Sequence, residues 1–137
     1  MKPVINVCAA IIAQNSKVLL AQRPAGSHLE LQWEFPGGKI MDGETPENCI
    51  QRELKEELAI ETEAVKHFDS VLFAYPEKDV KISFYICKIK SGMPQPLQCA
   101  SFTWIKPEEI NIADLVPADR VILPKLLKLI TPGRLSL

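Results

Sequence analysis

Three glutamates, Glu53, Glu56 and Glu57, stand close together in the segment RELKEEL. Their spacing of i, i+3 and i+4 places the three carboxylates side by side on one face of a helix, where like charges repel. A solvated acidic face, partly balanced by neighbouring basic residues, is the plainest interpretation. The double glycine at 37–38 favours another one, because glycine lets the backbone approach a ligand closely and clustered carboxylate oxygens suit Mg²⁺ bridged to a phosphate.

The segment from Gly38 to Ile60, GKIMDGETPENCIQRELKEELAI, resembles the Nudix box, which is written G-x5-E-x7-R-E-U-x-E-E-x-G-U with U an aliphatic residue. Every fixed position matches except Ala59, where the family has glycine. So many fixed positions at fixed spacing are far more specific than a lone glycine-rich loop. The flanking segments LLAQRP, WEFPGGK and PADRVIL are also similar to the MutT branch of nucleoside triphosphate pyrophosphohydrolases, so the resemblance covers most of the chain.

The resemblance implies an α/β fold, the Nudix α/β/α sandwich, with a mixed β-sheet between helices. In that fold the box forms a loop, a helix and a second loop around divalent metal, which is Mg²⁺ with Mn²⁺ as a substitute. The implied metal ligands are one backbone carbonyl and three carboxylates, those of Gly37, Glu53, Glu56 and Glu57. Arg52 is implied to pair with a carboxylate of the box, first of all Glu44, and to hold the loop on the helix.

The implied reaction is attack of a metal-activated water on a substrate phosphorus, in this branch usually the β-phosphorus. The products would be a nucleoside monophosphate and pyrophosphate. A polyphosphate carries several negative charges, which metal ions and basic side chains neutralise while they position an in-line attack. Lys39 and Arg23 are the cations expected at the phosphates, beside the open backbone of Gly38, with plain surface charges as the alternative.

The base is expected to contact Asp119, which stands in VPADR where the MutT branch places a polar residue at the start of the last helix. An ionised carboxylate only accepts hydrogen bonds, so Asp119 fits the two adjacent donors of guanine or 8-oxoguanine. Cytosine would need a protonated Asp119, which burial favours. Helix capping is the alternative for Asp119. Phe35 either stacks on the base or fills the core, and His28 is a weaker candidate contact.

A modified purine triphosphate such as 8-oxo-dGTP is therefore the first expected substrate. CTP or a modified dCTP is the second, because PADRVIL also resembles relatives that act on cytidine nucleotides. Removal of pyrophosphate from RNA 5′ ends is disfavoured, since the chain has no basic track. The alternative from another class is a catalytically weak Nudix-fold regulator that binds nucleotides. Such a module is expected to have lost a carboxylate of the box, whereas this sequence keeps them all.

Two residues depart from the family pattern. Ala59 stands where glycine would accept a positive φ at the helix end, so either alanine costs about 1 kcal/mol or the turn closes differently. Gln98 stands where many relatives place a glutamate that binds metal or helps to activate water, and an amide is a weaker ligand and no base. Catalysis would then depend on Glu53, with Glu44 and Glu56 as the other candidates.

The elements that would position these groups follow from apolar periodicity and from turn residues. Strands are predicted at 4–12, 17–23, 70–75, 80–89 and 101–105. A helix is predicted from about 46 to 58, with Thr45 as its cap and Pro46 in its first turn. A C-terminal helix over 117–130 contains Pro124, which must kink it or lie in its first turn. Residues 23–39 are expected to form a long loop or an irregular strand. The buried stripe of the first helix would be Ile50, Leu54 and Leu58.

The composition is that of one globular domain over 1–137, with 47% hydrophobic residues and a net charge of -1. A chain without a basic run is not expected to form a stable nucleic-acid complex, so the expected partner is a small nucleotide. The apolar start is interrupted by Asn6 and closed by Gln14, so we expect neither a secretory nor a membrane segment and a cytoplasmic protein. The cysteines are scattered and are expected to be free, mostly buried thiols, with a disulfide as the less favoured alternative. They are Cys8, Cys49, Cys87 and Cys99.

Overall fold

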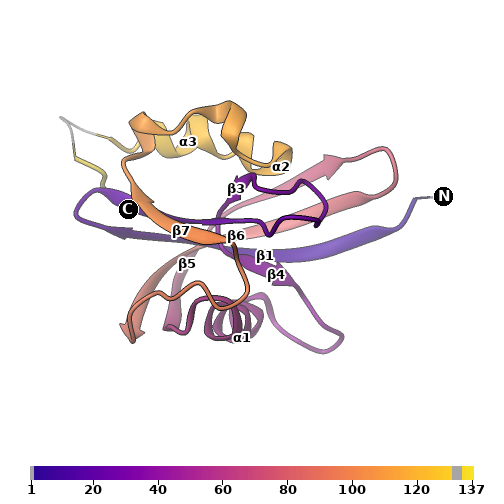
Figure 1. Ribbon diagram of the computed structural model, residues 1–137, viewed down its shortest axis with the longest axis horizontal. Helices are drawn as coiled ribbons and strands as arrows, with labels where there is room; N and C mark the ends of the chain where they lie inside the picture. The colour runs from indigo at the N-terminus through magenta and orange to yellow at the C-terminus, as the bar shows by residue number, and fades with distance from the viewer. Residues whose placement is uncertain (1, 131–133) are drawn as a thin grey trace.

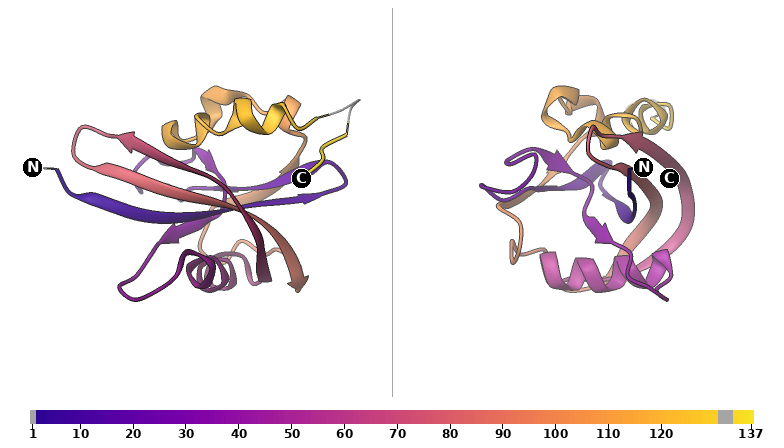
Figure 2. Two further views of the ribbon diagram at one scale, coloured as in Figure 1. Left: turned by 180° about the vertical axis from the view of Figure 1, so that it is seen from behind. Right: turned by 90° about the vertical axis from the view of Figure 1, so that its right-hand side faces the viewer.

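A computed structural model describes residues 2–130 and 134–137 (Figure 1). Within these residues, seven strands form one mixed sheet that lies between α1 (Pro46–Leu58) on one side and two short helices near the C-terminus on the other. The right-hand view of Figure 2 shows these layers, with the curved sheet between them. The predicted α/β/α sandwich is therefore confirmed.

Strands are present at all five predicted places, and two more lie inside the predicted irregular segment. The strands are β1 (Val4–Gln14), β2 (Lys17–Gln22), β3 (Trp33–Glu34), β4 (Gly37–Lys39), β5 (Glu61–Ala74), β6 (Asp79–Ser91) and β7 (Ser101–Ile105). Short 3₁₀ turns follow at Pro107–Glu109 and Ile112–Asp114. The main difference from prediction is β5, which begins at Glu61 rather than at 70, directly after the turn that ends α1.

The central strand β1 pairs with three neighbours and brings the double glycine into the middle of the molecule. It runs parallel to β6, while its other edge pairs antiparallel first with β4 and then with β2. In this register Gly38 lies opposite Cys8 and Gly37 opposite Ala9. A Cβ atom at Gly37 would overlap the carbonyl of Cys8, so only glycine allows β4 to approach β1 this closely.

Two apolar layers hold the helices on the two faces of the sheet, because side chains of β1 alternate between the faces. Cys8, Ala10 and Ile12 pack with α1, whereas Ala9 and Ile11 pack with the C-terminal helices. The predicted stripe of α1 is fully buried in the first layer, together with Cys49: Ile50, Leu54 and Leu58. The alternation thus fixes which face of the sheet α1 covers.

Both ends of α1 are formed as local sequence chemistry requires. The Thr45 hydroxyl accepts a hydrogen bond from the Asn48 N–H at 3.1 Å, which confirms the predicted cap. At the other end, Ala59 adopts the left-handed conformation, with φ of 59°, and its N–H donates to the Lys55 carbonyl at 3.1 Å. The turn therefore closes as it would with glycine, and alanine carries a strain of about 1 kcal/mol.

The C-terminal helix predicted over 117–130 is divided in two. The chain forms two shorter helices, α2 (Pro117–Arg120) and α3 (Leu123–Leu127). Pro124 lies in the first turn of α3, one of the two positions foreseen for it, because a proline lacks the N–H that a helix interior needs. No helix in the described ranges is long and apolar enough to span a membrane. The expected cytoplasmic location stays a prediction.

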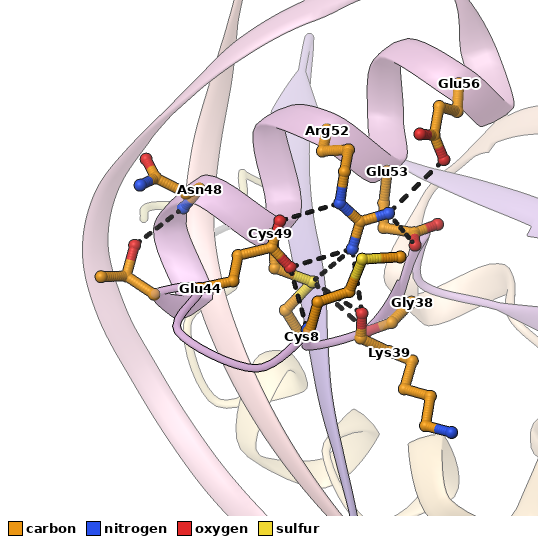
Figure 3. The surroundings of a disulfide bond; sticks show 11 residues. Cys8, Gly38, Lys39, Glu44, Asn48, Cys49, Arg52, Glu53 and Glu56 are labelled. Atoms are coloured by element: carbon orange, nitrogen blue, oxygen red, sulfur yellow. Dashed lines mark hydrogen bonds and ion pairs between the residues drawn. A yellow bond between two sulfur atoms is a disulfide. The ribbon is translucent and has the colours of Figure 1, made fainter.

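The expectation of free thiols is wrong for two of the cysteines, since Cys8 in β1 and Cys49 in α1 form a disulfide. Their Cα atoms are 6.4 Å apart, within the range that a disulfide spans. Both side chains are fully buried between sheet and helix, and the Cys49 Sγ lies 3.5 Å from the carbonyl oxygens of both Gly38 and Lys39 (Figure 3). Cys87 and Cys99 are free. The fold, rather than any spacing in the sequence, brings the pair together.

Candidate active site

Arg52 is the centre of the box and ties its loop to α1 (Figure 3). Its guanidinium donates to both oxygens of Glu44, at 2.8 Å and 2.9 Å, so the expected pair is present. It also donates to the Lys39 carbonyl at 3.0 Å and to Glu53 at 2.7 Å, with Glu56 further away at 3.5 Å. The hydrogen bonds from Arg52, and then one from the Met41 N–H, lower the pKa of Glu44 to about 2. Glu44 is therefore an ionised structural partner of Arg52 at neutral pH.

Glu53 lies against the double glycine. A Cβ atom at Gly38 would overlap its carboxylate, so glycine at this position makes room for the acid. The Glu53 side chain is mostly buried and the Glu56 side chain is exposed, and both bind the same nitrogen of Arg52. The carboxylate of Glu53 thus sits where loop and helix meet, held by a positive charge.

Glu57 is a partly buried carboxylate of the box. Burial, and then the negative charges of Glu34 and Glu53, raise the pKa of Glu57 to about 8, against the opposing charge of Arg23. A carboxylate deprived of water and placed beside like charges is typical of a site that binds a cation.

The donor set of the box fits a hard divalent metal, since carboxylate and carbonyl oxygens are the ligands that Mg²⁺ prefers. In the described part of the chain, no three acidic, histidine or cysteine side chains lie close enough together to form a complete metal site. Two of the predicted ligands, Glu53 and Glu56, instead bind Arg52. The set can hold a metal once these side chains rotate towards it, so we treat the ligands as a prediction.

A small cavity of about 130 Å³ joins Glu57 to residues outside the box. Gln98 lines it, and the Gln98 N–H donates to the Glu57 carbonyl at 3.3 Å. Gln98, which stands where the family resemblance places a glutamate, therefore lies beside Glu57. The other residues that line this cavity are Gln22, Arg23, Pro24, Glu34, Gly37 and Cys99.

A second cavity of about 250 Å³ brings together every residue predicted to bind substrate, and the weaker candidate as well: Arg23, His28, Phe35, Gly38, Lys39 and Asp119. Gly37 lines both cavities and so joins this one to the acid cluster. The side chain of Lys39 points away from the Arg52 network (Figure 3). The His28 ring meets the edge of Tyr75, with ring centres 5.8 Å apart, and its Nε2 lies 4.0 Å from the Glu77 carboxylate.

Asp119 and Phe35 form the floor of this second cavity. Asp119 is 3% exposed, and its Oδ2 accepts a hydrogen bond from the Phe35 N–H at 2.8 Å. Val116 caps α2 without a side-chain hydrogen bond, so the capping alternative for Asp119 is wrong. Burial raises the pKa of Asp119 well above its ordinary value, and the charge of Glu34 adds to this. Phe35 packs edge-on against Phe84 in the core, so of its two predicted roles the structure shows the packing role.

Sequence reasoning missed two residues of the site. Glu34 binds Arg23 and faces both cavities, and its only signal was a single acid between the aromatic residues of WEFPGG. Tyr75 lines the second cavity, and its hydroxyl accepts a hydrogen bond from the Ala118 N–H at 3.3 Å. Its position just before the turn between β5 and β6 gave no sign of this contact.

Comparison with known proteins agrees with this geometry. The family model for the NUDIX domain matches residues 2–126. The chain belongs to the NUDIX domain family. It is 30% identical over 126 residues to the 8-oxo-dGTP diphosphatase of Escherichia coli, covering 91% of this chain and 98% of that protein. It is also 36% identical over 115 residues to the CTP pyrophosphohydrolase of Escherichia coli, covering 84% and 85%.

A solved structure shows the same fold. The MutT NUDIX hydrolase from Burkholderia pseudomallei superimposes with a TM-score of 0.82 over 91% of this chain and 99% of that one. Its identity of 23% supports the fold alone. Family membership, together with a box that keeps all its charged positions, makes this NUDIX domain a Nudix hydrolase.

Proposed function

We propose that this NUDIX domain hydrolyses a nucleoside triphosphate to the monophosphate and pyrophosphate in a reaction that depends on Mg²⁺. The observation that carries the proposal is the continuity of the site through Gly37, which lines both the cavity beside Glu57 and the cavity over Asp119. A nucleotide can thus place its base on Asp119 and its phosphates at the acid cluster. Basic side chains stand along the way, as Lys39 and Arg23 line the larger cavity.

The carbonyl of Gly37 and the carboxylates of Glu53, Glu56 and Glu57 would hold Mg²⁺, with Mn²⁺ as a substitute. When bound, the metal supplies a polarised water and neutralises phosphate charge. The chain's own residues orient the site: Arg52 holds Glu44 and Glu53, and through the Lys39 carbonyl it also holds the loop. In the free protein the pKa of Glu57 is raised to about 8. A cation that binds this carboxylate would therefore compete with a proton.

An oxidised purine, as in 8-oxo-dGTP, is the first candidate base. Its Watson–Crick edge offers two donors to an ionised Asp119. Its other edge offers the N7–H donor beside the O6 acceptor, which also matches a protonated Asp119; guanine lacks this pair on that edge, because guanine N7 accepts, and matches a protonated acid only through N1–H and O6. Both protonation states of the buried acid therefore find a partner on 8-oxoguanine. The relative that acts on 8-oxo-dGTP, aligned over nearly the whole chain, supports this choice.

CTP or a modified dCTP is the second candidate, and the burial of Asp119 favours it. A neutral carboxylic acid donates one hydrogen bond and accepts another, which matches the N3 acceptor and the N4 amine of cytosine. The raised pKa of Asp119 promotes that neutral form. The similarity to a CTP pyrophosphohydrolase also supports it.

A substrate panel tests the proposal. The panel holds dGTP, 8-oxo-dGTP, CTP and 5-methyl-dCTP, each with and without Mg²⁺, and the released products are identified by mass spectrometry. We expect metal-dependent release of pyrophosphate, fastest for 8-oxo-dGTP. If the nucleotides raise the melting temperature but none is hydrolysed, the protein is a binding module and the proposal is wrong.

A further inference from the structure

Glu34 lies outside the Nudix box, yet its carboxylate borders both halves of the site. It lines the cavity over Asp119 and also the small cavity beside Glu57. Only 21% of its side chain is exposed. A carboxylate this sheltered needs a partner of opposite charge. The partner is Arg23, the residue directly after β2.

Arg23 is held at three places. Its Nε donates to the His28 carbonyl at 2.6 Å, and its Nη1 donates to both oxygens of Glu34, at 3.1 Å and 3.3 Å. Its backbone closes the loop that follows, since its N–H donates to Gln32 and its carbonyl accepts from Leu31. The backbone of Arg23 is therefore fixed, and only its side-chain torsions can redirect the charge.

One nitrogen of the Arg23 guanidinium, Nη2, is available to a ligand. In the described ranges, Nη2 of Arg23 has no hydrogen-bond partner, whereas Nε and Nη1 are both engaged. Because the guanidinium is planar, fixing two of its nitrogens fixes the direction of the third. The two N–H groups of Nη2 are thus oriented before any ligand arrives.

The charged partner that faces Glu34 in the described residues is Arg23. Burial raises the pKa of Glu34, while Arg23 opposes that rise through its charge and its hydrogen bonds. Both oxygens of Glu34 are already occupied by Arg23, so the acid acts through the cation that it binds.

We propose that Glu34 is a positioning residue, which holds the Arg23 guanidinium so that Nη2 contacts the phosphates of a bound triphosphate. This inference rests on the proposed function, because it takes Arg23 as a phosphate contact. It adds a residue for which neither the box nor its spacing gives any signal.

The test is a double-mutant cycle over Glu34→Gln and Arg23→Gln. Its first readout is calorimetric binding, with Mg²⁺, of guanosine and cytidine triphosphate analogues that carry a methylene group between the α- and β-phosphorus. The matching nucleosides serve as ligands without phosphates. We expect Glu34→Gln to weaken analogue binding about tenfold, the effect of one charge-assisted hydrogen bond. Nucleoside binding should change much less, since Glu34 acts on the base only through its charge near Asp119. In the Arg23→Gln background the same change should alter analogue binding less than about twofold.

Two further variants separate positioning from a loss of fold. Glu34→Asp keeps the charge and should retain more analogue affinity than Glu34→Gln. Glu63→Gln breaks an exposed ion pair of the same 3.1 Å length, Glu63 with Lys88, and should change nothing. Equal losses from Glu34→Gln in both Arg23 backgrounds, or an equal loss of nucleoside binding, would overturn the proposal. Because binding is measured without turnover, a protein that hydrolyses nothing would refute the proposed function and still test Glu34.

Discussion

The acid cluster and the base cavity meet at Gly37 but are built in different ways. The acid cluster comes from one continuous segment that Arg52 ties together and that a disulfide anchors to the central strand. The base cavity comes from segments far apart in the chain, joined by contacts such as the Phe35–Asp119 hydrogen bond across 84 residues. The first region therefore has a geometry that its own sequence imposes, whereas the second depends on how the C-terminal helices dock. We expect changes in the first to affect the chemistry, and changes in the second to affect the choice of base.

The largest effect is expected for Glu53→Gln. It removes the charge that lies against Gly38 and weakens the bond from Arg52, while the shape of the side chain is kept. Turnover should fall about a thousandfold, with the melting temperature nearly unchanged. Pyrophosphate release at saturating Mg²⁺ measures it, and Glu63→Gln serves as the control. A variant with normal metal-dependent turnover would remove Glu53 from the chemistry.

The disulfide should matter for stability rather than for base choice. It closes a loop with a sequence separation of 41 residues, for which a chain-entropy estimate gives roughly 4 kcal/mol. Cys49→Ala should therefore lower the melting temperature by about 10 °C.

Cys87→Ala is the matched control, because Cys87 is a buried free thiol in the same apolar layer. It should lower the melting temperature less than Cys49→Ala does. Reductant should lower the melting temperature of the unchanged protein but not that of Cys49→Ala. If reductant has no effect on either protein, the bridge does not contribute to stability.

Asp119→Asn should sharpen the contrast between the two regions. The pKa of Asp119 is raised in the folded state, so above its ordinary pKa the folded protein binds more protons than the unfolded chain. The free energy of unfolding therefore falls as the pH rises above the ordinary pKa of an aspartate. The asparagine variant should consequently melt at a higher temperature than the unchanged protein at pH 7. The difference should shrink as the pH falls towards 4, which melting curves over this range would show.

The same variant tests base recognition. Relative rates on 8-oxo-dGTP and CTP should vary with pH in the unchanged protein, because Asp119 changes between acceptor and donor. They should become independent of pH in Asp119→Asn, whereas Asp114→Asn, at an exposed acid nearby, should keep the pH dependence. A uniform loss of activity on all bases would show that Asp119 serves only the fold.

The smallest effect is expected for Ala59→Gly. The left-handed strain at Ala59 is relieved, while the greater freedom of glycine in the unfolded chain offsets part of the gain. The net stabilisation should be at most about 0.5 kcal/mol, which differential scanning calorimetry would detect as a small rise in melting temperature. Turnover should not change. A lower melting temperature would mean that the alanine at this turn is not strained.

More contacts could be predicted from the sequence in the acid cluster than in the base cavity, and the reason is physical. In the box, helix periodicity alone predicted the buried stripe and the shared face of the carboxylates, and the family pattern predicted the Arg52–Glu44 pair. These contacts are local, so spacing along the chain determines them. The cap at Thr45 is local in the same sense.

The misses are contacts between distant segments. Cys8 and Cys49 meet only because β1 passes under α1, and Glu34 meets Arg23 only because β3 pairs with β2. The break between α2 and α3 was foreseen at Pro124 as one of two alternatives, since proline's missing N–H does not decide where a helix restarts. Asp119 was found through resemblance, whereas its bond to Phe35 required the fold.

Hydrolysis of 8-oxo-dGTP in water labelled with ¹⁸O, with Mg²⁺ present, tests the central claim most directly. Attack on the β-phosphorus transfers the water oxygen to that phosphorus and leaves the bridging oxygen on the monophosphate. Mass spectrometry should therefore find monophosphate without label and pyrophosphate with one labelled oxygen. Formation of diphosphate and inorganic phosphate, or no metal-dependent product from any triphosphate, would contradict the account.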